Sequence, residues 1–212
     1  MALARRDELV SLAAPVRERL DAANAAREKG LGAARRTIQL CSQSIRATHR
    51  LDWDQAADIA DSAEASLREA QEALRPFPQL AASGPLHDAA KEYAEARLTL
   101  ALAADRPLPS AEELGVADAS WLNGLAEAAS ELRRHLLDRL RAGEMNQSER
   151  LLTAMDDVYA LLVTVDYPDA LTGGLRRTTD ALRPVLERTR GDLTTTILQQ
   201  RLQRAIEGGL KE

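Results

Sequence analysis

Apolar residues recur every three or four positions along most of the chain, which is the spacing of a helix with one buried face. Leu9, Leu12, Val16 and Leu20 form the first such stripe. The stripes predict helices over residues 3–28, from the glycines at 30 and 32 to about 48, from 52 or 54 to about 74, 85–104, 118–142, from 146 or 148 to about 165, and from 166 onward. No credible pair of strands interrupts this pattern, so the predicted fold class is all-α.

Glycine and proline mark the predicted ends of these helices. Gly30 and Gly32 predict a break between the first two helices, and Gly191 with Asp192 predicts the start of a last one. Pro184 should kink the helix that contains it, because proline removes a backbone donor. The spacing of Ser110 and Glu113 is that of a capping box, and it predicts a short helix ending at Gly115.

The proline-rich joints of the chain are short. Residues 76–78 and 107–109 each place two prolines around one apolar residue. Such joints are typical of turns between helices, because they are too short to separate independently folding units. The sequence therefore predicts one domain over residues 1–212, built as a bundle of about seven helices.

Composition narrows the fold and the surroundings of the chain. Aromatic residues make up 3% of it, so Leu, Ala, Val and Ile must build the core, which favours closely packed helices. A lone cysteine, Cys41, cannot form an internal disulfide and is interpreted as an inert thiol in a reducing compartment. No apolar run has the length of a membrane span, and charges follow the N-terminus at once. We therefore expect a cytoplasmic protein without membrane contact.

Charge and familiar motifs exclude several functions. The formal net charge is −5, so a polyanionic partner would need a local basic patch or a bound cation. Gly-rich phosphate loops, Cys-x-x-Cys, Gly-x-Ser-x-Gly and Glu-x-x-His are all absent from the sequence. The histidines at positions 49, 87 and 135 are scattered, which argues against a zinc hydrolase or a histidine-based acid–base site.

Two pairs of carboxylates stand out. Glu92 and Glu95 are three residues apart on one predicted helix, and Glu127 and Glu131 are four apart on the next long one. Each pair projects from one face of its helix. If the two helices faced each other, the carboxylates would converge and would suit Mg²⁺ or Mn²⁺, which prefer oxygen ligands. The alternative is that both pairs lie on ordinary solvated helix faces.

Basic and aromatic side chains supply candidate contacts to nucleic acid. Phosphate groups are held mainly by cationic side chains close to the backbone. The candidates are Arg35, Arg36, Arg46, Arg50, His87, Lys91, Arg133 and Arg134. Each could equally be an ordinary helix-surface charge. Trp53 and Trp121 could stack on bases, but their positions beside apolar residues at helix starts favour packing roles.

Several segments resemble the translin family. Residues 121–125, Trp-Leu-Asn-Gly-Leu, and 129–134, Ala-Ser-Glu-Leu-Arg-Arg, resemble a segment shared by translin and its partner, translin-associated factor X. Arg36-Thr37-Ile38 resembles a motif of that partner. Residues 167–170, 175–177 and 190–193 are similar to the C-terminal segment of prokaryotic members. The resemblance spans roughly residues 20–195.

The resemblance implies a fold, an assembly and an activity. Family members are all-α bundles of about seven helices that assemble into closed, barrel-like oligomers, often octamers, with nucleic acid inside. Translin binds single-stranded RNA and DNA, and its partner is a Mg²⁺-dependent endoribonuclease for single strands. By this resemblance the chain is expected to be a homo-oligomer that takes single-stranded RNA, and also single-stranded DNA, as ligand.

The resemblance also implies roles for individual residues. Glu92-Tyr93-Ala94-Glu95 matches the Glu-Tyr-x-Glu motif of the catalytic subunit, and Glu127 and Glu131 match its two later acids, although the subunit has Asp at the position of Glu127. Glu92, Glu95 and Glu127 would be catalytic and would bind Mg²⁺ or Mn²⁺, with Glu131 as a fourth ligand or outer acceptor. The residues expected to hold the phosphate backbone are Arg35, Arg36, His87 and Lys91.

Three hypotheses follow. The first is a metal-dependent endoribonuclease acting on single-stranded RNA. The second is a translin-like protein that binds single-stranded nucleic acid without cleaving it. The third is a helical oligomer with a structural role and no affinity for nucleic acid, which the net charge of −5 favours.

Overall fold

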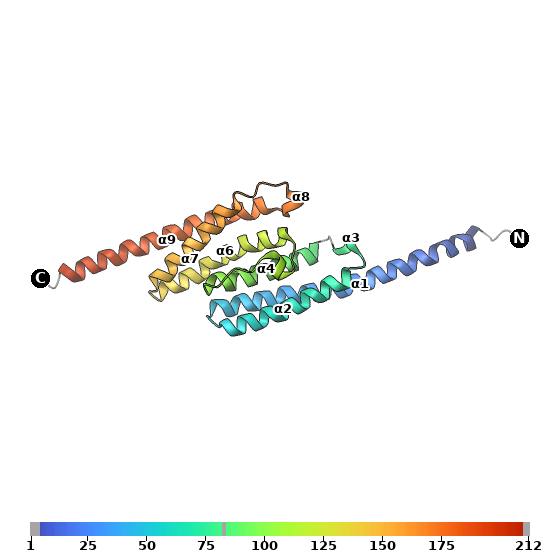
Figure 1. Cartoon of the computed structure of the whole chain (residues 1–212), viewed down its shortest axis with the longest axis horizontal. Helices are drawn as coiled ribbons and strands as arrows, with labels where there is room; N and C mark the ends of the chain where they lie inside the picture. Colours follow the sequence, from blue (N-terminus) through green and yellow to red (C-terminus); the bar gives the residue numbers. More distant parts are fainter. Residues whose placement is uncertain (1–4, 82–83, 210–212) are drawn as a thin grey trace.

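The computed structural model of the chain describes residues 5–81 and 84–209, and this part of the chain is helical with short connections (Figure 1). The helices are α1 (Arg5–His49), α2 (Trp53–Leu74), α3 (Pro78–Ala81), α4 (Gly84–Ala103), α5 (Ala111–Leu114), α6 (Asp118–Arg141), α7 (Met145–Leu162), α8 (Asp169–Thr172) and α9 (Leu175–Gly209). The predicted all-α class is confirmed. Residues 3 and 4, which begin the first predicted helix, lie outside the described residues.

The long helices pack side by side as a bundle. α1 packs against α2 and α4, α4 packs against α6, and α6 packs against α7 and α9. Figure 1 shows the first part of α1 and the last part of α9 projecting from opposite ends of the bundle. The stripe from Leu9 to Leu20, which its periodicity suggested would face a core, is therefore exposed. No helix in the described ranges combines the length and the apolarity that crossing a membrane requires.

The predicted break at Gly30 and Gly32 is wrong, because α1 continues through both glycines. Glycine inside a helix costs about 1 kcal/mol relative to alanine. Gly30 is buried, and a Cβ built on it would lie 2.8 Å from Cγ of Leu74. This glycine therefore allows α2 to approach α1 closely, and the packing gained there offsets its low helix propensity.

The C-terminal part of the chain also differs from the prediction. A short α8 ends at Gly173 and Gly174, both with positive φ, and the long helix begins only at Leu175. α9 then runs through both Pro184 and Gly191, so no separate last helix starts at Gly191. Pro184 is exposed, so water can satisfy the carbonyl that loses its donor.

The predicted cap of α5 is confirmed. Ser110 and Glu113 form a reciprocal capping box, and Gly115 ends the helix in the left-handed conformation. Trp121 at the start of α6 donates from Nε1 to the carbonyl of Pro109 at 2.9 Å and packs against the core. This side chain therefore anchors the preceding loop rather than standing free to stack on a base.

Candidate metal centre

A glycine brings α4 and α6 into backbone contact. A Cβ built on Gly124 of α6 would lie 2.8 Å from Cβ of Ala94, 2.9 Å from the amide nitrogen of Glu95 and 2.9 Å from the carbonyl oxygen of Lys91. Two of these three atoms belong to the backbone of α4. The clash of a Cβ with them could therefore not be relieved by moving a flexible side chain. Because Glu127 lies three residues after Gly124, this crossing sets it against the acidic face of α4.

Three carboxylates meet at this crossing. Glu92, Glu95 and Glu127 each offer an oxygen, and these oxygens all lie within 4.8 Å of one another. Glu92 and Glu127 are partly exposed, whereas Glu95 is 8% exposed and forms the inner end of the group. The condition stated for convergence, that the two helices face each other, therefore holds for Glu92, Glu95 and Glu127.

The carboxylates line an open cleft of about 440 Å³ between three helices. α4 contributes Glu92 and Glu95, and α6 contributes Glu127 and Glu131 together with Arg134. The remaining lining comes from α1 and consists of Ser42, Ile45, Arg46 and His49. A ligand entering the cleft would therefore meet four carboxylates and two exposed arginines.

Lys91 partly neutralises the cluster. Its Nζ donates to Oε1 of Glu127 at 2.8 Å and lies 3.6 Å from Oε1 of Glu92. Burial acts to lower the pKa of Lys91, but the hydrogen bond and the negative charge of Glu127 raise it overall. The ammonium group is therefore held in its charged form and lies between the carboxylates of Glu92 and Glu127.

The cluster carries more negative charge than Lys91 balances. Burial raises the pKa of Glu95 to about 9, and the charges of Glu92, Glu127 and Glu131 act in the same direction. Burial also raises the pKa of Glu92, and Glu127 adds to this effect while Lys91 opposes it. Like charges at such distances disfavour ionisation, so Glu95 favours its protonated form at neutral pH, and a bound cation would displace that proton.

His49 is a cleft residue that the analysis of the sequence missed. Its Nε2 lies 2.9 Å from Oε2 of Glu131, and this hydrogen bond lowers the pKa of that carboxyl against the effect of burial. The His49 side chain is 4% exposed, and its Nδ1 has no partner in the described chain. A signal was present in the sequence, because residues 42, 45, 46 and 49 share one helix face.

The residues predicted to hold phosphate are placed differently from one another. Lys91 lies among the carboxylates. Arg36 forms an ion pair with Glu69 of α2, Arg35 is exposed on α1, and neither lines the cleft. His87 also lies outside the lining, where its Nδ1 is 3.1 Å from Oγ of Ser120.

Two arginines from the longer set of basic candidates do line the cleft. They are Arg46 of α1 and Arg134 of α6. They are therefore better placed than Arg35, Arg36 or His87 to meet a polyanion that reaches the acids.

Cys41 lies close behind the acidic group but has the properties of a structural residue. It is fully buried, and burial together with the charges of Glu92 and Glu95 raises the pKa of its thiol to about 12. A thiol that stays protonated is a poor nucleophile and a poor metal ligand. The chemistry available to the cleft is therefore that of carboxylate oxygens.

The carboxylate set fits a hard divalent cation. Mg²⁺ and Mn²⁺ prefer oxygen ligands, and an all-carboxylate group without thiolate favours them over zinc. The raised pKa of Glu95 and the ion pair of Lys91 with Glu127 indicate that positive charge stabilises this arrangement.

Comparisons with known proteins give a consistent result. No family model matches the chain. An uncharacterized protein of Methanocaldococcus jannaschii is 30% identical over 179 residues, which cover 84% of this chain and 79% of the relative. The solved structure of AfC3PO is 30% identical, with a TM-score of 0.80 over 87% of this chain and 96% of that one.

Two further structures agree with this match. A complex of AfC3PO with duplex RNA has a TM-score of 0.77 at 29% identity, again over 87% of this chain and 96% of that one. The structure of apo-NeC3PO has a TM-score of 0.76 over 92% of this chain and 99% of that one, and at 20% identity it supports the fold alone. Together with the translin-like segments and the shared helical fold, these relatives show that the chain belongs to the C3PO/translin family.

Proposed function

We propose that the chain is a metal-dependent endoribonuclease that cleaves single-stranded RNA and also accepts single-stranded DNA. The observation that carries this proposal is the meeting of Glu92, Glu95 and Glu127, whose oxygens lie within 4.8 Å of one another. Three acids held this closely are costly unless protons or a cation neutralise them. The three acids line an open cleft, and such costly groups of charge are typical of ligand sites.

Glu92, Glu95 and Glu127 would hold Mg²⁺ or Mn²⁺, with Glu131 as a fourth ligand or as an acceptor for bound water. A divalent ion in such a site lowers the pKa of water and stabilises negative charge on a phosphate group. His49 holds Oε2 of Glu131 through its Nε2, which restricts the direction of the other carboxylate oxygen. Glu127 reaches one methylene further than aspartate, so it shapes the choice and position of the ion.

Cationic residues around the acids would hold the nucleic acid. Arg46 and Arg134 stand at the wall of the cleft, and Lys91 could turn from Glu127 to a phosphate once a metal ion has taken its place. Local cations of this kind answer the objection that the chain has a net charge of −5. The complex of AfC3PO with duplex RNA supports a nucleic-acid ligand and makes duplex RNA the natural comparison substrate.

The proposal includes an assembly and a location. The family resemblance supports a homo-oligomer, with the octamer as the expected form. The lone cysteine, Cys41, supports the reducing cytoplasm as the location. Assembly would enclose the cleft and exclude bulk water from it, which strengthens electrostatic interactions with a bound backbone.

The decisive experiment measures cleavage of a fluorescent single-stranded RNA with Mg²⁺, with Mn²⁺ and with a chelator. Glu127→Gln is nearly isosteric and should reduce the rate at least about 100-fold, because it removes a charged ligand. Glu72→Gln on the exposed face of α2 is the matched control and should cleave at the wild-type rate. Equal rates for wild type and Glu127→Gln would contradict the proposal.

A non-catalytic binder is the second candidate. The ion pairs of Lys91 with Glu127 and Glu92 favour it, because they show how the chain could neutralise these acids without metal. Such a protein would retain RNA on a filter with strong salt dependence and would yield no metal-dependent product. The structural oligomer would retain no RNA at either of two salt concentrations.

A further inference from the structure

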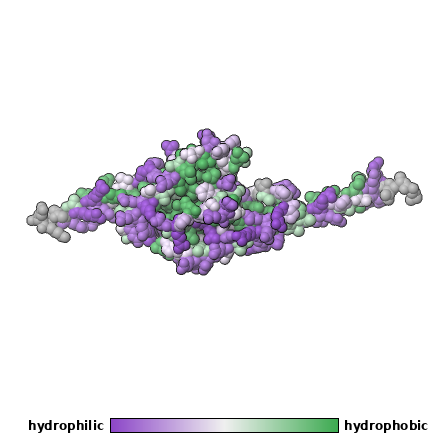
Figure 2. Space-filling view, in the orientation of Figure 1, coloured by the Kyte–Doolittle hydropathy of each residue, from purple (hydrophilic) through white to green (hydrophobic). Residues whose placement is uncertain are grey.

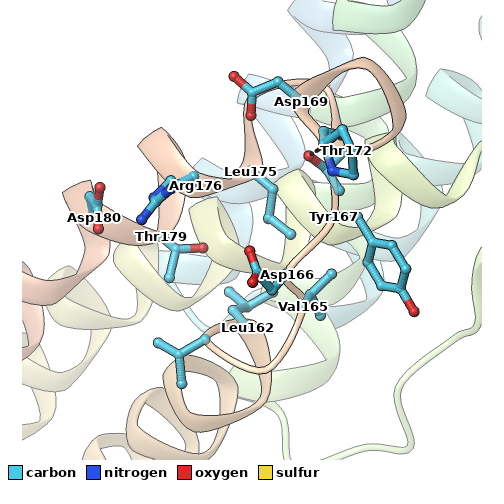
Figure 3. Close-up of a pocket in the computed structure, with 12 residues that line it drawn as sticks. Leu162, Val165, Asp166, Tyr167, Asp169, Thr172, Leu175, Arg176, Thr179 and Asp180 are labelled. Carbon is cyan, nitrogen blue, oxygen red and sulfur yellow. Dashed lines mark hydrogen bonds between the residues drawn. The ribbon is translucent and has the colours of Figure 1, made fainter.

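A second hollow, of about 710 Å³, opens where the end of α7, the α7–α8 connection and the start of α9 meet (Figure 3). Leu162, Val165 and Leu175 supply its apolar part. Its charged lining includes Asp166 from the connection, and Arg176 and Asp180 from α9. None of the four acids of the candidate metal centre lines it, so the hollow needs its own explanation.

Large apolar side chains surround this hollow on the surface. Leu161, Val163, Tyr167 and Leu171 belong to the same segments and are between 49% and 67% exposed. In Figure 2 apolar atoms gather at the upper middle of the molecule, near α8 and the neighbouring parts of α7 and α9. A clustered apolar patch of this kind marks an interaction surface more often than an isolated exposed leucine does.

The charges beside the patch have no ion-pair partners in the described part of the chain. This is true of Asp166, Arg176 and Asp180, although Arg176 and Asp180 lie one helical turn apart on α9. The arginines of the central bundle differ, since Arg97, Arg133 and Arg150 all have acidic partners. The face around the hollow therefore offers apolar area together with free charges of both signs.

We propose that this face binds the same face of a second copy of the chain about a two-fold axis. The inference rests on the self-association included in the proposed function and names the surface that carries it. Two α9 helices crossing antiparallel near residue 178 would place Arg176 of each copy opposite Asp180 of the other. A two-fold contact repeats each pair, so it satisfies both signs of charge on both copies.

The charge of this face disfavours RNA as its ligand. Asp166, Asp169 and Asp180 outnumber Arg176 in the lining, so the local charge is negative and would repel an RNA backbone. A second copy presents the same excess of acid. It also presents Arg176 as a partner for Asp180 of the first copy, together with an equal apolar patch. Interfaces between copies of one chain are typically apolar at the centre and charged at the rim.

The test measures molar mass of the full chain by light scattering after size exclusion, over about 1–100 µM. Leu171→Glu places a charge on the most exposed of the four large apolar residues of this face and should raise the dissociation constant at least about 10-fold. Leu108→Glu, at an exposed leucine of the α4–α5 loop, is the matched control and should leave the mass unchanged.

Charge reversal tests the pairing itself. Arg176→Asp and Asp180→Arg should each weaken association about 3- to 10-fold, and the double variant should restore it, because the pair is then reversed on both copies. Both positions are exposed and unpaired within the described chain, so these variants should keep the fold.

Three outcomes would overturn the proposal: a monomeric wild type at 100 µM, an assembly of unchanged mass in Leu171→Glu, or a double variant no stronger than either single one. Mn²⁺ binding by Leu171→Glu, followed by the electron paramagnetic resonance of the ion, reports separately on the metal centre. A normal Mn²⁺ signal in a protein whose mass is unchanged would therefore reject this face and leave the nuclease proposal standing.

Discussion

The two polar faces of α4 contain similar residues and differ in how charge is balanced. On one face Glu92 and Glu95 meet Glu127, and Lys91 supplies the bonded cation. On the other face Arg97 donates to Oδ1 of Asp61 at 2.6 Å, to Oε2 of Glu64 at 3.0 Å and to the hydroxyl of Tyr93 at 2.9 Å. Both sets are partly buried and both bridge α4 to a neighbouring helix.

This difference separates a structural network from a candidate ligand site. Around Arg97 the charges alternate in sign, each donor has an acceptor, and the aromatic ring of Tyr93 lies beneath the guanidinium at 5.5 Å. Around Glu95 like charges are held together, and burial raises its pKa to about 9. A protein tolerates the second arrangement where function needs it, so the imbalance of charge is informative about function where the residue types are not.

The largest effect on stability is expected from a substitution that separates α4 and α6 at the crossing that creates the acidic face. Gly124→Ala introduces a Cβ within 2.9 Å of the α4 backbone and should destabilise the fold by about 2–4 kcal/mol, measured by urea unfolding. Gly32→Ala is the matched control, since its Cβ would meet only Nη1 of Arg36 at 3.9 Å. The control should be neutral or stabilising by up to about 1 kcal/mol. Equal effects would show that α4 and α6 do not need this close approach.

The next effect tests whether the acidic face is strained without metal. The folded chain keeps a proton on Glu95 up to a pKa of about 9, whereas an unfolded chain releases it near the ordinary pKa of 4.5. The folded state thus binds more protons between these values, and stability falls as pH rises through this window. Glu95→Gln removes the penalty and should stabilise the metal-free protein by about 1–3 kcal/mol at pH 7.

Thermal unfolding in a chelator at pH 4 and pH 8 checks this prediction. The gain from Glu95→Gln should appear at pH 8, by about 2–4 °C for each kcal/mol, and should vanish near pH 4. Added Mn²⁺ should stabilise the wild type and leave the variant unchanged. A lower melting temperature for Glu95→Gln at pH 8 would show that the carboxylates are well accommodated as they stand.

On the opposite face of α4, removing a charged side chain should lower the stability of the fold instead of raising it. Arg97→Met keeps much of the side-chain volume but leaves Asp61 and the hydroxyl oxygen of Tyr93 without the guanidinium donor, and leaves Glu64 with Tyr93 and Arg68 as its donors. We expect a destabilisation of about 1–2 kcal/mol. Arg68→Met is the control, because its pair with Glu64 is exposed and should contribute at most about 0.5 kcal/mol.

The smallest effect concerns the cation among the acids. Lys91→Met removes the partner of Glu127 and should lower metal-free stability by about 0.5–1 kcal/mol. The same change should tighten Mn²⁺ binding, measured by calorimetry, because the ion no longer competes with the ammonium group. Weaker Mn²⁺ binding would mean that Lys91 supports the metal site instead of occupying it.

Periodicity predicted the helices in which side-chain spacing decides the structure, and failed where a partner helix decides it. The helices at 85–104 and 118–142 correspond to α4 and α6 within a few residues. Gly30 is wrongly predicted to be a break. The reason for a glycine at this position is its contact with Leu74, which lies 44 residues away in the chain. Gly191 is likewise wrongly predicted to start a helix, because α9 continues through it.

The candidate site divides in the same way. Glu92, Glu95, Glu127 and Glu131 could be selected in advance, because acids three or four residues apart share a helix face and because they match a family motif. Arg46 is only one of several basic candidates in the sequence and His49 is not selected at all, because the place of both in the cleft arises only when α1 packs against α4 and His49 reaches Glu131 of α6. The histidines at 49, 87 and 135 looked scattered, yet His49 lies against Glu131.

The order of apolar and polar residues was sufficient to determine that this chain is helical and which acids share a face, because both follow from a repeat of 3.6 residues within one segment. Tertiary packing decided which faces meet. The close crossing at Gly124, the approach of His49 to Glu131 and the exposed face around Leu171 depend on contacts between segments far apart in the chain. Such contacts are selected by the fit of whole surfaces, and no local period encodes them.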